Sequence, residues 1–178
     1  MKLSIPYYSQ YINVNDPEWQ PRACGVVCLK MLLDSKHTQT TSLDEMIVQG
    51  DAIGAYGKSG WEHDGLVALA KQYGVKLERV EWRQSDDRNS DELNEEGINV
   101  ILRQLEAGSP VMVSAIKNFE VKNKFHMVLI VGAEIDEGIV KGFYYHDPDS
   151  YTETNGAYQF VPFGVFSTAW RRMAIFAK

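Results

Sequence analysis

The sequence predicts an α+β fold, with helices in the first half of the chain and an antiparallel β-sheet in the second. Apolar residues recur at helical spacing in several stretches of the first half. The second half holds short runs rich in β-branched and aromatic residues, separated by turn sequences. Helices followed by strands are typical of α+β proteins with an antiparallel sheet. Because the 178 residues contain no evident repeat or linker, we expect a single domain over residues 1–178.

The composition excludes several classes of protein. Hydrophobic residues make up 44% and charged residues 24% of the chain, which is typical of globular proteins. The formal net charge is −6 without a basic stripe, so we expect no nucleic-acid partner. No run is long enough to span a membrane, and the N-terminus lacks the apolar core of a signal peptide. We therefore expect no membrane association and a cytoplasmic location, which also suits two free cysteines. We expect no cofactor.

The first half is expected to contain one short strand and three helices. The strand is expected over residues 4–10, and a loop rich in Asn, Asp and Pro follows over 11–23. Three stretches have helical periodicity: residues 24–34, 42–49 and 63–73. Ser42 and Glu45 form the signature of a capping box at the start of the second helix. Residues 50–60 are expected to form a glycine-rich loop.

The second half is expected to contain one helix and five strands. The helix is expected over residues 95–107, because apolar residues recur on one face and glycine and proline follow its end. Residues 83–92 are charged and have almost no large apolar side chains, so they are expected to form a surface excursion. The strands are expected over residues 75–82, 111–116, 126–135, 139–147 and around 172–176.

Cys24 stands at the start of the first expected helix, just before Gly25. The N-terminal end of a helix favours a thiolate through its dipole and its unpaired N–H groups. The backbone N–H of Cys24 would also point toward a developing oxyanion, and Gly25 would let a substrate backbone approach closely. Cys28 lies one turn further along among apolar residues, and is expected to be a core residue. Four residues apart on one helix, the two thiols are poorly placed for a disulfide.

His126 and Asp147 are expected to meet at the open end of a β-hairpin. Residues 136–138, Asp-Glu-Gly, are the only turn signal between them. A hairpin that turns there places His126 opposite Asp147 or its neighbour, with Cβ atoms roughly 4.5–5.5 Å apart. His146 is expected to point to the other face of the sheet. This register selects His126 over His146 as a general base and Asp147 over Asp149 as the residue that orients it.

Each of these residues also has a simpler explanation. A cysteine followed by glycine at a helix start is usually a packed core thiol, a histidine at a sheet edge can be structural, and Asp147-Pro148 is ordinary turn chemistry. Trp61 and His63 are candidates for lining a substrate cleft, and packing at the entry to a helix explains them equally well. The order and placement of the three residues together favour catalysis.

Two other kinds of site are poorly supported by the sequence. Zinc bound by the two cysteines, His126 and His146 would need a stronger ligand pattern than a single pair of cysteines with three residues between them. Residues 57–59, Gly-Lys-Ser, match the end of a phosphate-binding loop, but Ala52 replaces the earlier glycine. We therefore expect no metal site and no phosphate-binding loop.

Four short motifs in order resemble the double-glycine peptidase-like families, which are papain-like cysteine peptidase domains related to bacteriocin-leader-processing peptidases. The motifs extend over nearly the whole chain, and Gly60-Trp61 and Tyr73-Gly74-Val75 are further landmarks of the same kind. In chain order they are Ile5-Pro6-Tyr7-Tyr8-Ser9-Gln10, Ala23-Cys24-Gly25 with its apolar helix, Phe125-His126 with a Val-rich strand, and His146-Asp147-Pro148. The resemblance implies a papain-like fold whose helical half carries the nucleophile.

The resemblance also implies roles for individual residues. Cys24 corresponds to the nucleophile, His126 to the general base and acid, Asp147 to the orienting residue, and Gln10 to the glutamine that completes the oxyanion hole. Gln20 is a rival for that last role, because it lies closer to the cysteine in sequence.

The chain departs from the family pattern in two further ways. Val26 stands where a proline commonly follows Cys-Gly. Leader-processing members are fused to a membrane transporter, whereas this sequence has no such segment, which argues against cleavage of double-glycine leaders.

The sequence leaves three functions open. The first is a cysteine peptidase that acts on a peptide or protein substrate through a thioester. The second is an acyltransferase or transglutaminase-like enzyme, which uses the same three residues but transfers the acyl group to an amine. The third is a non-catalytic binding module of the same fold. The substrate and the oligomeric state are not indicated by the sequence.

Overall fold

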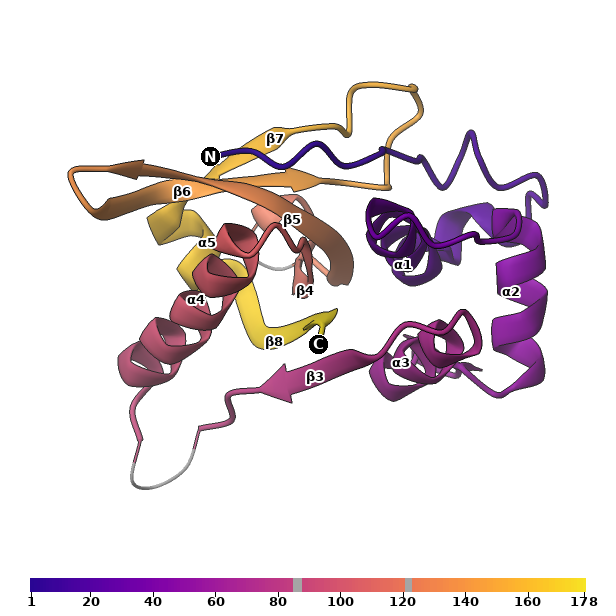
Figure 1. Ribbon diagram of the computed structural model, residues 1–178, viewed down its shortest axis with the longest axis horizontal. Coiled ribbons are helices and arrows are strands. Elements are labelled where there is room, and N and C mark those ends of the chain that lie inside the picture. The colour runs from indigo at the N-terminus through magenta and orange to yellow at the C-terminus, as the bar shows by residue number, and fades with distance from the viewer. Residues whose placement is uncertain (85–87, 121–122) are drawn as a thin grey trace.

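Six antiparallel strands form the central sheet of the computed structural model, which describes residues 1–84, 88–120 and 123–178. The strand order is β3-β8-β4-β5-β6-β7, so the C-terminal strand lies between β3 and β4 (Figure 1). The strands are β3 (Leu77–Glu81), β4 (Val111–Ile116), β5 (Phe125–Asp136), β6 (Ile139–His146), β7 (Gln159–Pro162) and β8 (Trp170–Ala177).

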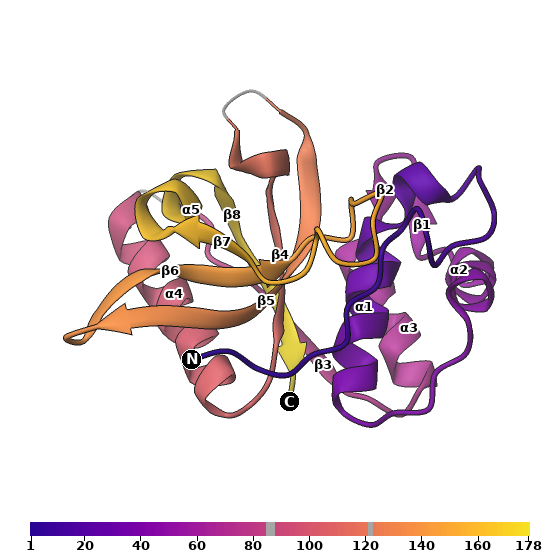
Figure 2. The same cartoon turned by 90° about the horizontal axis from the view of Figure 1, so that it is seen from above.

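The helices lie in two groups on opposite sides of the sheet. Figure 2 shows α1, α2 and α3 together at one end of the molecule, and α4 and α5 beside the other part of the sheet. These helices are α1 (Cys24–Ser35), α2 (Leu43–Ala52), α3 (His63–Gln72), α4 (Ser90–Glu106) and α5 (Phe163–Ala169). The shorter elements are η1 (Gln20–Arg22), η2 (Lys117–Phe119), β1 (Tyr56–Gly57) and β2 (Gly60–Trp61). Helices and an antiparallel sheet confirm the predicted α+β fold class.

Two hydrophobic clusters fix these groups to the two faces of the sheet. One joins the apolar side chains of α1, α2 and α3 to strand residues such as Leu129 and Ile175. The other joins α4 and α5 to residues such as Val113 and Ile130. Helix α1 is central to the first cluster, because eight of its residues are buried. Burial on this scale holds the start of α1 at a defined place beside β5.

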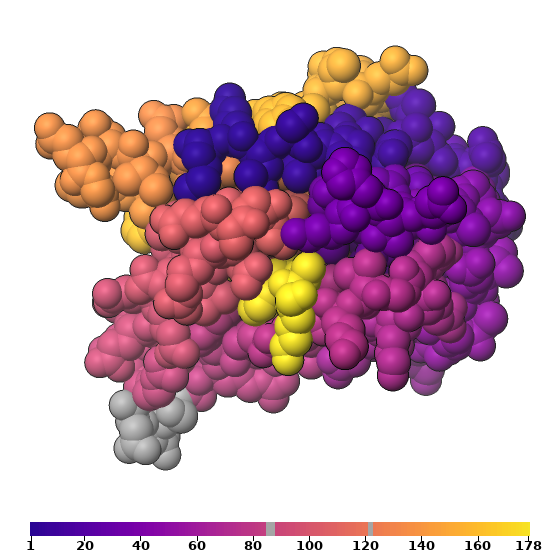
Figure 3. All heavy atoms as spheres, viewed as in Figure 1, coloured from indigo at the N-terminus to yellow at the C-terminus, as the bar shows by residue number. Residues whose placement is uncertain are grey.

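The N-terminal segment does not form the strand expected over residues 4–10. Only Lys2 forms a bridge, with Gly132 of β5, and the segment then crosses from the sheet to the helices (Figures 1 and 3). Its backbone groups bond to several different partners: Tyr8 to the sulfur of Met31, and Gln10 to the carbonyl of Pro148. The segment therefore joins the two halves of the molecule instead of extending the sheet.

The other differences from the prediction lie at element ends and near the C-terminus. Helix α4 begins five residues earlier than expected, because Asn89 and Glu92 form a capping box and Leu93 is buried. Residues 85–87 of the expected surface excursion lie outside the described residues. Strand β7 and helix α5 were not predicted, since both are short and lack clear periodicity. The capping box of Ser42 and Glu45 is confirmed at the start of α2. Within the described residues, none of the helices has the length and apolar character that crossing a membrane requires.

Candidate active site

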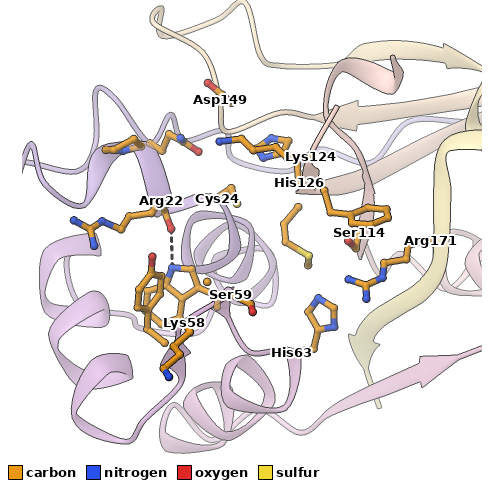
Figure 4. A pocket seen from close by; sticks show the side chains of 17 residues that line it. Arg22, Cys24, Lys58, Ser59, His63, Ser114, Lys124, His126, Asp149 and Arg171 are labelled. Carbon is orange, nitrogen blue, oxygen red and sulfur yellow. Dashed lines mark hydrogen bonds between the residues drawn. The ribbon is translucent and has the colours of Figure 1, made fainter. Parts of the chain in front are cut away.

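Cys24 is the first residue of α1 and lies at the wall of a cleft between the helices and the sheet (Figure 4). Cys24 as a residue is partly exposed. Val27 donates to the carbonyl of Ala23 as the first bond of the helix, so the N–H groups of Cys24, Gly25 and Val26 precede the helical ladder. No side chain among the described residues caps this end. The thiol therefore lies where the helix dipole favours an anion.

His126 lies near the start of β5 with only 6% of its surface exposed. Its Nε2 donates a hydrogen bond to Asp147 Oδ1 at 2.6 Å. Burial acts to lower the pKa of His126, but the hydrogen bonds with Asp147 and Cys24 outweigh it and raise the pKa to about 10. The ring is therefore protonated at neutral pH.

Asp147 follows the last residue of β6 and is fixed from several directions. Its Oδ1 accepts the backbone N–H of Asp149 at 2.9 Å in addition to the histidine. Its own N–H donates to the carbonyl of Gly156, and its carbonyl accepts the hydroxyl of Tyr7. A Cβ at Gly156 would lie 2.1 Å from the Asp147 carbonyl oxygen, so this close approach requires glycine. The carboxylate is thus held in place before any ligand binds.

The contact between His126 and Asp147 is diagonal rather than directly across the hairpin. The pairing of β5 with β6 ends at Leu129 and His146, three residues after His126 and one before Asp147. The pairs at the turn and at the open end share one register, which differs by one residue from the predicted one, and the two irregularities between them cancel. The structure nevertheless brings together the two residues that the register argument selected.

The charges of Cys24 and His126 stabilise one another. Burial acts to raise the pKa of the Cys24 thiol, but the hydrogen bond and the charge of His126 bring that pKa below its ordinary value. Backbone N–H groups at Met127 and Gly25 act in the same direction. A thiolate beside an imidazolium is the form of this pair that a nucleophilic cysteine requires.

Cys28 and His146 lie deeper and make structural contacts. The thiol of Cys28 is completely buried, donates to the carbonyl of Met127 at 3.5 Å, and has a pKa raised first by burial. His146 bonds through Nε2 to the carbonyl of Ile5 and accepts the N–H of Tyr158 at Nδ1. Both ring nitrogens are therefore occupied and unavailable to a metal. Among the described residues, no group of three His, Cys, Asp or Glu side chains is arranged to hold a metal ion.

The two glutamine candidates for the oxyanion hole differ in their surroundings. Gln10 lines the cleft with Cys24 and His126, is 2% exposed, and has an Oε1 without a donor among the described residues. Gln20 instead donates its amide to the carbonyls of Tyr11 and Val14. Its amide therefore holds the loop before α1, which leaves Gln10 as the glutamine in the cleft.

Gly25 and Trp61 pack against one another at the base of the cleft. A Cβ at Gly25 would lie 2.9 Å from Cβ of Trp61, and Gly25 is buried and not part of the cleft lining. This packing is sufficient to explain the glycine, and the substrate-binding role expected from the sequence stays a prediction. Trp61 lines the cleft with one edge and donates Nε1 to the carbonyl of Arg22 at 3.0 Å. Both explanations given for Trp61, cleft wall and packing, therefore apply.

The cleft also contains residues that sequence reasoning missed. Its volume is about 380 Å³, and Ser114 of β4, Lys124 and Arg171 of β8 contribute to its wall (Figure 4). The sequence does not indicate that these residues share a cleft. Ser114 and Arg171 meet through the pairing of β4 with β8, which could not be read from the sequence. Residues 57–59, which match the end of a phosphate-binding loop in sequence only, lie at the turn between β1 and β2.

The chain is similar to known proteins over nearly its whole length. The model of the Peptidase_C39 like family matches residues 2–176. No curated protein matches the chain.

Three solved structures have a similar fold. A candidate C39-like peptidase from Bacillus anthracis is 18% identical with a TM-score of 0.69, over 100% of this chain and 98% of that one. A double-glycine-motif protease from an AMS/PCAT transporter, in complex with a leader peptide, is 14% identical with a TM-score of 0.61, over 99% and 93%. The peptidase domain of ComA from Streptococcus, a bifunctional ABC transporter of a quorum-sensing pathway, is 17% identical with a TM-score of 0.58, over 99% and 96%. At these identities the likeness shows a shared C39 peptidase fold.

Proposed function

The chain belongs to the Peptidase_C39 like family, and we propose that it hydrolyses peptide bonds with Cys24 as nucleophile, His126 as general acid and base, and Asp147 as the orienting residue. The observation that carries this proposal is the placement of a helix-terminal thiol beside a histidine that Asp147 holds at 2.6 Å. The three residues come from α1, β5 and the end of β6, so only the folded chain assembles them.

In the first half of the reaction, the Cys24 thiolate attacks the carbonyl carbon of the scissile bond. The backbone N–H of Cys24 and the amide of Gln10 stabilise the negative oxygen of the tetrahedral intermediate. Gln10 suits this role because its side chain is buried in the wall of the cleft that Cys24 and His126 also line. The His126 imidazolium then gives its proton to the leaving amine, and a thioester remains on Cys24.

In the second half, water attacks the thioester. Neutral His126 removes a proton from that water, the tetrahedral intermediate collapses, and the carboxylate product leaves as Cys24 returns to the thiolate. Asp147 keeps Nε2 protonated and thereby turns the other ring nitrogen toward Cys24 and the substrate. The same carboxylate stabilises the imidazolium that exists before acylation and after deacylation.

A peptide substrate is supported by the comparisons and by the cleft. One structure of similar fold holds a leader peptide, and the cleft is open at the surface beside the partly exposed residue Cys24. We also propose that the chain functions as one domain, which the family match over residues 2–176 supports. A reducing compartment such as the cytoplasm is proposed because both cysteines are free thiols.

Digestion of a proteome-derived peptide library, read by mass spectrometry, tests the proposal. Wild-type protein should produce new peptide termini, and Cys24→Ala should produce none while keeping its circular dichroism spectrum and melting temperature. A parallel digestion with excess hydroxylamine or a primary amine separates hydrolysis from acyl transfer. Products that carry only new carboxylates support the peptidase, whereas exclusive amide products require an acyltransferase. Equal product formation by wild type and Cys24→Ala would contradict catalysis by this thiol.

A further inference from the structure

The cleft carries positive charge although the chain as a whole is acidic. The formal net charge of the chain is −6. Four cationic side chains line the cleft against a single carboxylate, Asp149, and that carboxylate is already paired with Lys117. The four cations are Arg22, Lys58, Lys124 and Arg171. Among the described residues, none of the four forms an ion pair with a carboxylate. Clefts lined by one sign of charge concentrate ligands of the opposite sign.

One end of the cleft is lined by Arg171, Ser114 and His63. Figure 4 shows these three side chains together, away from Asp149. They come from β8, β4 and the first position of α3, respectively. Arg171 stacks over the ring of Phe125 at 4.7 Å, which fixes the direction of its guanidinium.

An irregularity in the sheet brings Ser114 and Arg171 side by side. Ala115 pairs with Trp170, but Val113 pairs with Ala174, so three residues of β8 lie opposite Ser114 alone. Arg172 has a φ of 54° within this bulge. Bulges of this kind re-aim side chains near functional sites. Here the bulge places Arg171 and the hydroxyl of Ser114 at the same end of the cleft.

Ser114 has the character of a ligand-binding residue. It is 3% exposed, lines the cleft, and its hydroxyl has no hydrogen-bond partner among the described residues. A hydroxyl at a cleft wall that has no protein partner is available to bond to a ligand. Because the neighbouring groups are a guanidinium and an imidazole, the ligand that fits is a hydrogen-bond acceptor with negative charge.

His63 reports a positive local potential. Its pKa is lowered first by burial and then by the positive charges of Arg79 and Arg171, which outweigh the opposing effects of Glu81 and Glu62. Arg79 is itself occupied by ion pairs with Asp64 and Glu81, so Arg171 is the cation that faces the cleft. The N–H groups at the start of α3 lie at this end too, and no side chain among the described residues caps them.

We propose that Arg171, Ser114 and His63 form a subsite for an acidic side chain of the substrate, so that the protein selects peptides with Glu or Asp close to the scissile bond. This inference rests on the proposed function. Arg171 supplies the charge, Ser114 and His63 supply hydrogen bonds, and the subsite lies in the same cleft as Cys24 and His126. Binding energy at such a subsite is available to position the scissile carbonyl against the thiolate.

Matched peptides test the subsite through hydrolysis. The sites cleaved in the peptide library should be enriched in Glu and Asp within about three residues of the cut. Amidated peptides that differ only by Glu or Gln at the enriched position should differ roughly tenfold in kcat/KM, with the difference shrinking from 50 mM to 500 mM salt. Arg171→Gln should abolish this ratio and Arg171→Glu should invert it in favour of Lys. Arg103→Gln, at an exposed position of α4, makes the same change of charge away from the cleft and should leave the ratio of Glu to Gln peptides unchanged.

A second measurement reads recognition without hydrolysis. N-iodoacetyl tripeptide amides with Glu or Gln at the first, second or third position alkylate Cys24 directly, and the subsite should make one Glu reagent react about tenfold faster than its Gln partner. Arg171→Gln should equalise the pair, and Ser114→Ala should reduce the difference. Equal rates for all pairs in the wild type, or efficient cleavage without acidic enrichment, would overturn the subsite and leave the peptidase intact. No cleavage together with a Glu preference in alkylation would overturn the peptidase and retain the subsite.

Discussion

The wall of the cleft and the buried interior each contain one cysteine and one histidine. The pKa values of these residues are shifted in opposite directions in the two regions. In the cleft, the pKa of Cys24 is lowered and the pKa of His126 is raised. In the interior, the pKa of Cys28 is raised and the pKa of His146 is lowered, in both cases first by burial. Burial acts on all four side chains, so burial alone does not distinguish the two regions.

The difference between the two regions is the partner of each group. Cys24 and His126 have each other, and Asp147 holds the far side of the imidazole, so the charged forms of both residues are stabilised. Cys28 and His146 have neutral backbone partners, which suit the uncharged forms. We therefore expect the reactivity of Cys24 to depend on its charged contacts with His126 and Asp147 rather than on residue type, and removing one contact should make the cleft resemble the interior.

The largest effect is expected from His126→Ala. Without the imidazolium, the pKa of Cys24 should return toward its ordinary range, and alkylation by iodoacetamide at pH 6 should slow by more than about 100-fold. Site-resolved mass spectrometry of alkylation against pH measures the rate at each cysteine. In the wild type, Cys24 should react rapidly below pH 7 while buried Cys28 remains unmodified. His37→Ala serves as the control, because His37 is exposed after α1 and outside the cleft lining. Identical Cys24 profiles in wild type and His126→Ala would show that the thiol is not paired with this histidine.

A smaller loss is expected from Asp147→Asn. The amide cannot stabilise the imidazolium, so kcat should fall by roughly 10- to 100-fold and the pKa of His126 should decrease. Nuclear magnetic resonance of the His126 ring protons, followed from pH 5 to 11, measures that pKa independently of any substrate. Asp136→Asn, at the tip of the β5–β6 hairpin, is the matched control and should change neither quantity. Normal turnover in Asp147→Asn would remove Asp147 from the proposed mechanism.

Local sequence signals predicted the parts of the site that depend on one or two elements. The start of α1 followed from helical periodicity, and the meeting of His126 with Asp147 followed from one hairpin turn. The register differs by one residue from the predicted one, because the chain turns on Glu137 and Gly138 alone and Asp136 still belongs to β5. The contact survived this error because both residues lie at strand ends, where a diagonal approach remains possible.

The parts that sequence could not supply depend on pairing between distant strands. Ser114 and Arg171 meet only because β8 inserts between β3 and β4 and carries a bulge. The N-terminal segment was expected as a strand, but its backbone bonds to the helical part and to the loop after β6, where Gln10 reaches Pro148. Partner choice of this kind is decided by the tertiary fold, which outweighs local β propensity.

The third prediction concerns Cys28, the thiol of the interior. Cys28→Ala removes one buried sulfur and leaves a small cavity, so the free energy of unfolding should fall by about 1–2 kcal/mol while Cys24 keeps its alkylation profile. Urea denaturation followed by tryptophan fluorescence measures the change. Cys24→Ala, at the partly exposed start of the same helix, should lose less stability and all activity. The reverse result, an inactive but fully stable Cys28→Ala, would exchange the roles of the two cysteines.

The smallest effect is expected in the pH dependence of the free energy of unfolding, through the titration of His146 and His126. The pKa of His146 is lowered in the folded protein from the ordinary 6.5, so the unfolded chain binds more protons below pH 6.5 and stability should fall as the pH decreases through that value. The pKa of His126 is raised to about 10, so its contribution is complete below pH 6.5 and is lost as the pH rises through 10. One proton changes the free energy of unfolding by at most about 1.4 kcal/mol per pH unit. Urea denaturation from pH 4.5 to 7 should therefore show a shallower slope for His146→Gln than for the wild type, and parallel curves would show that His146 is not held neutral by its backbone partners.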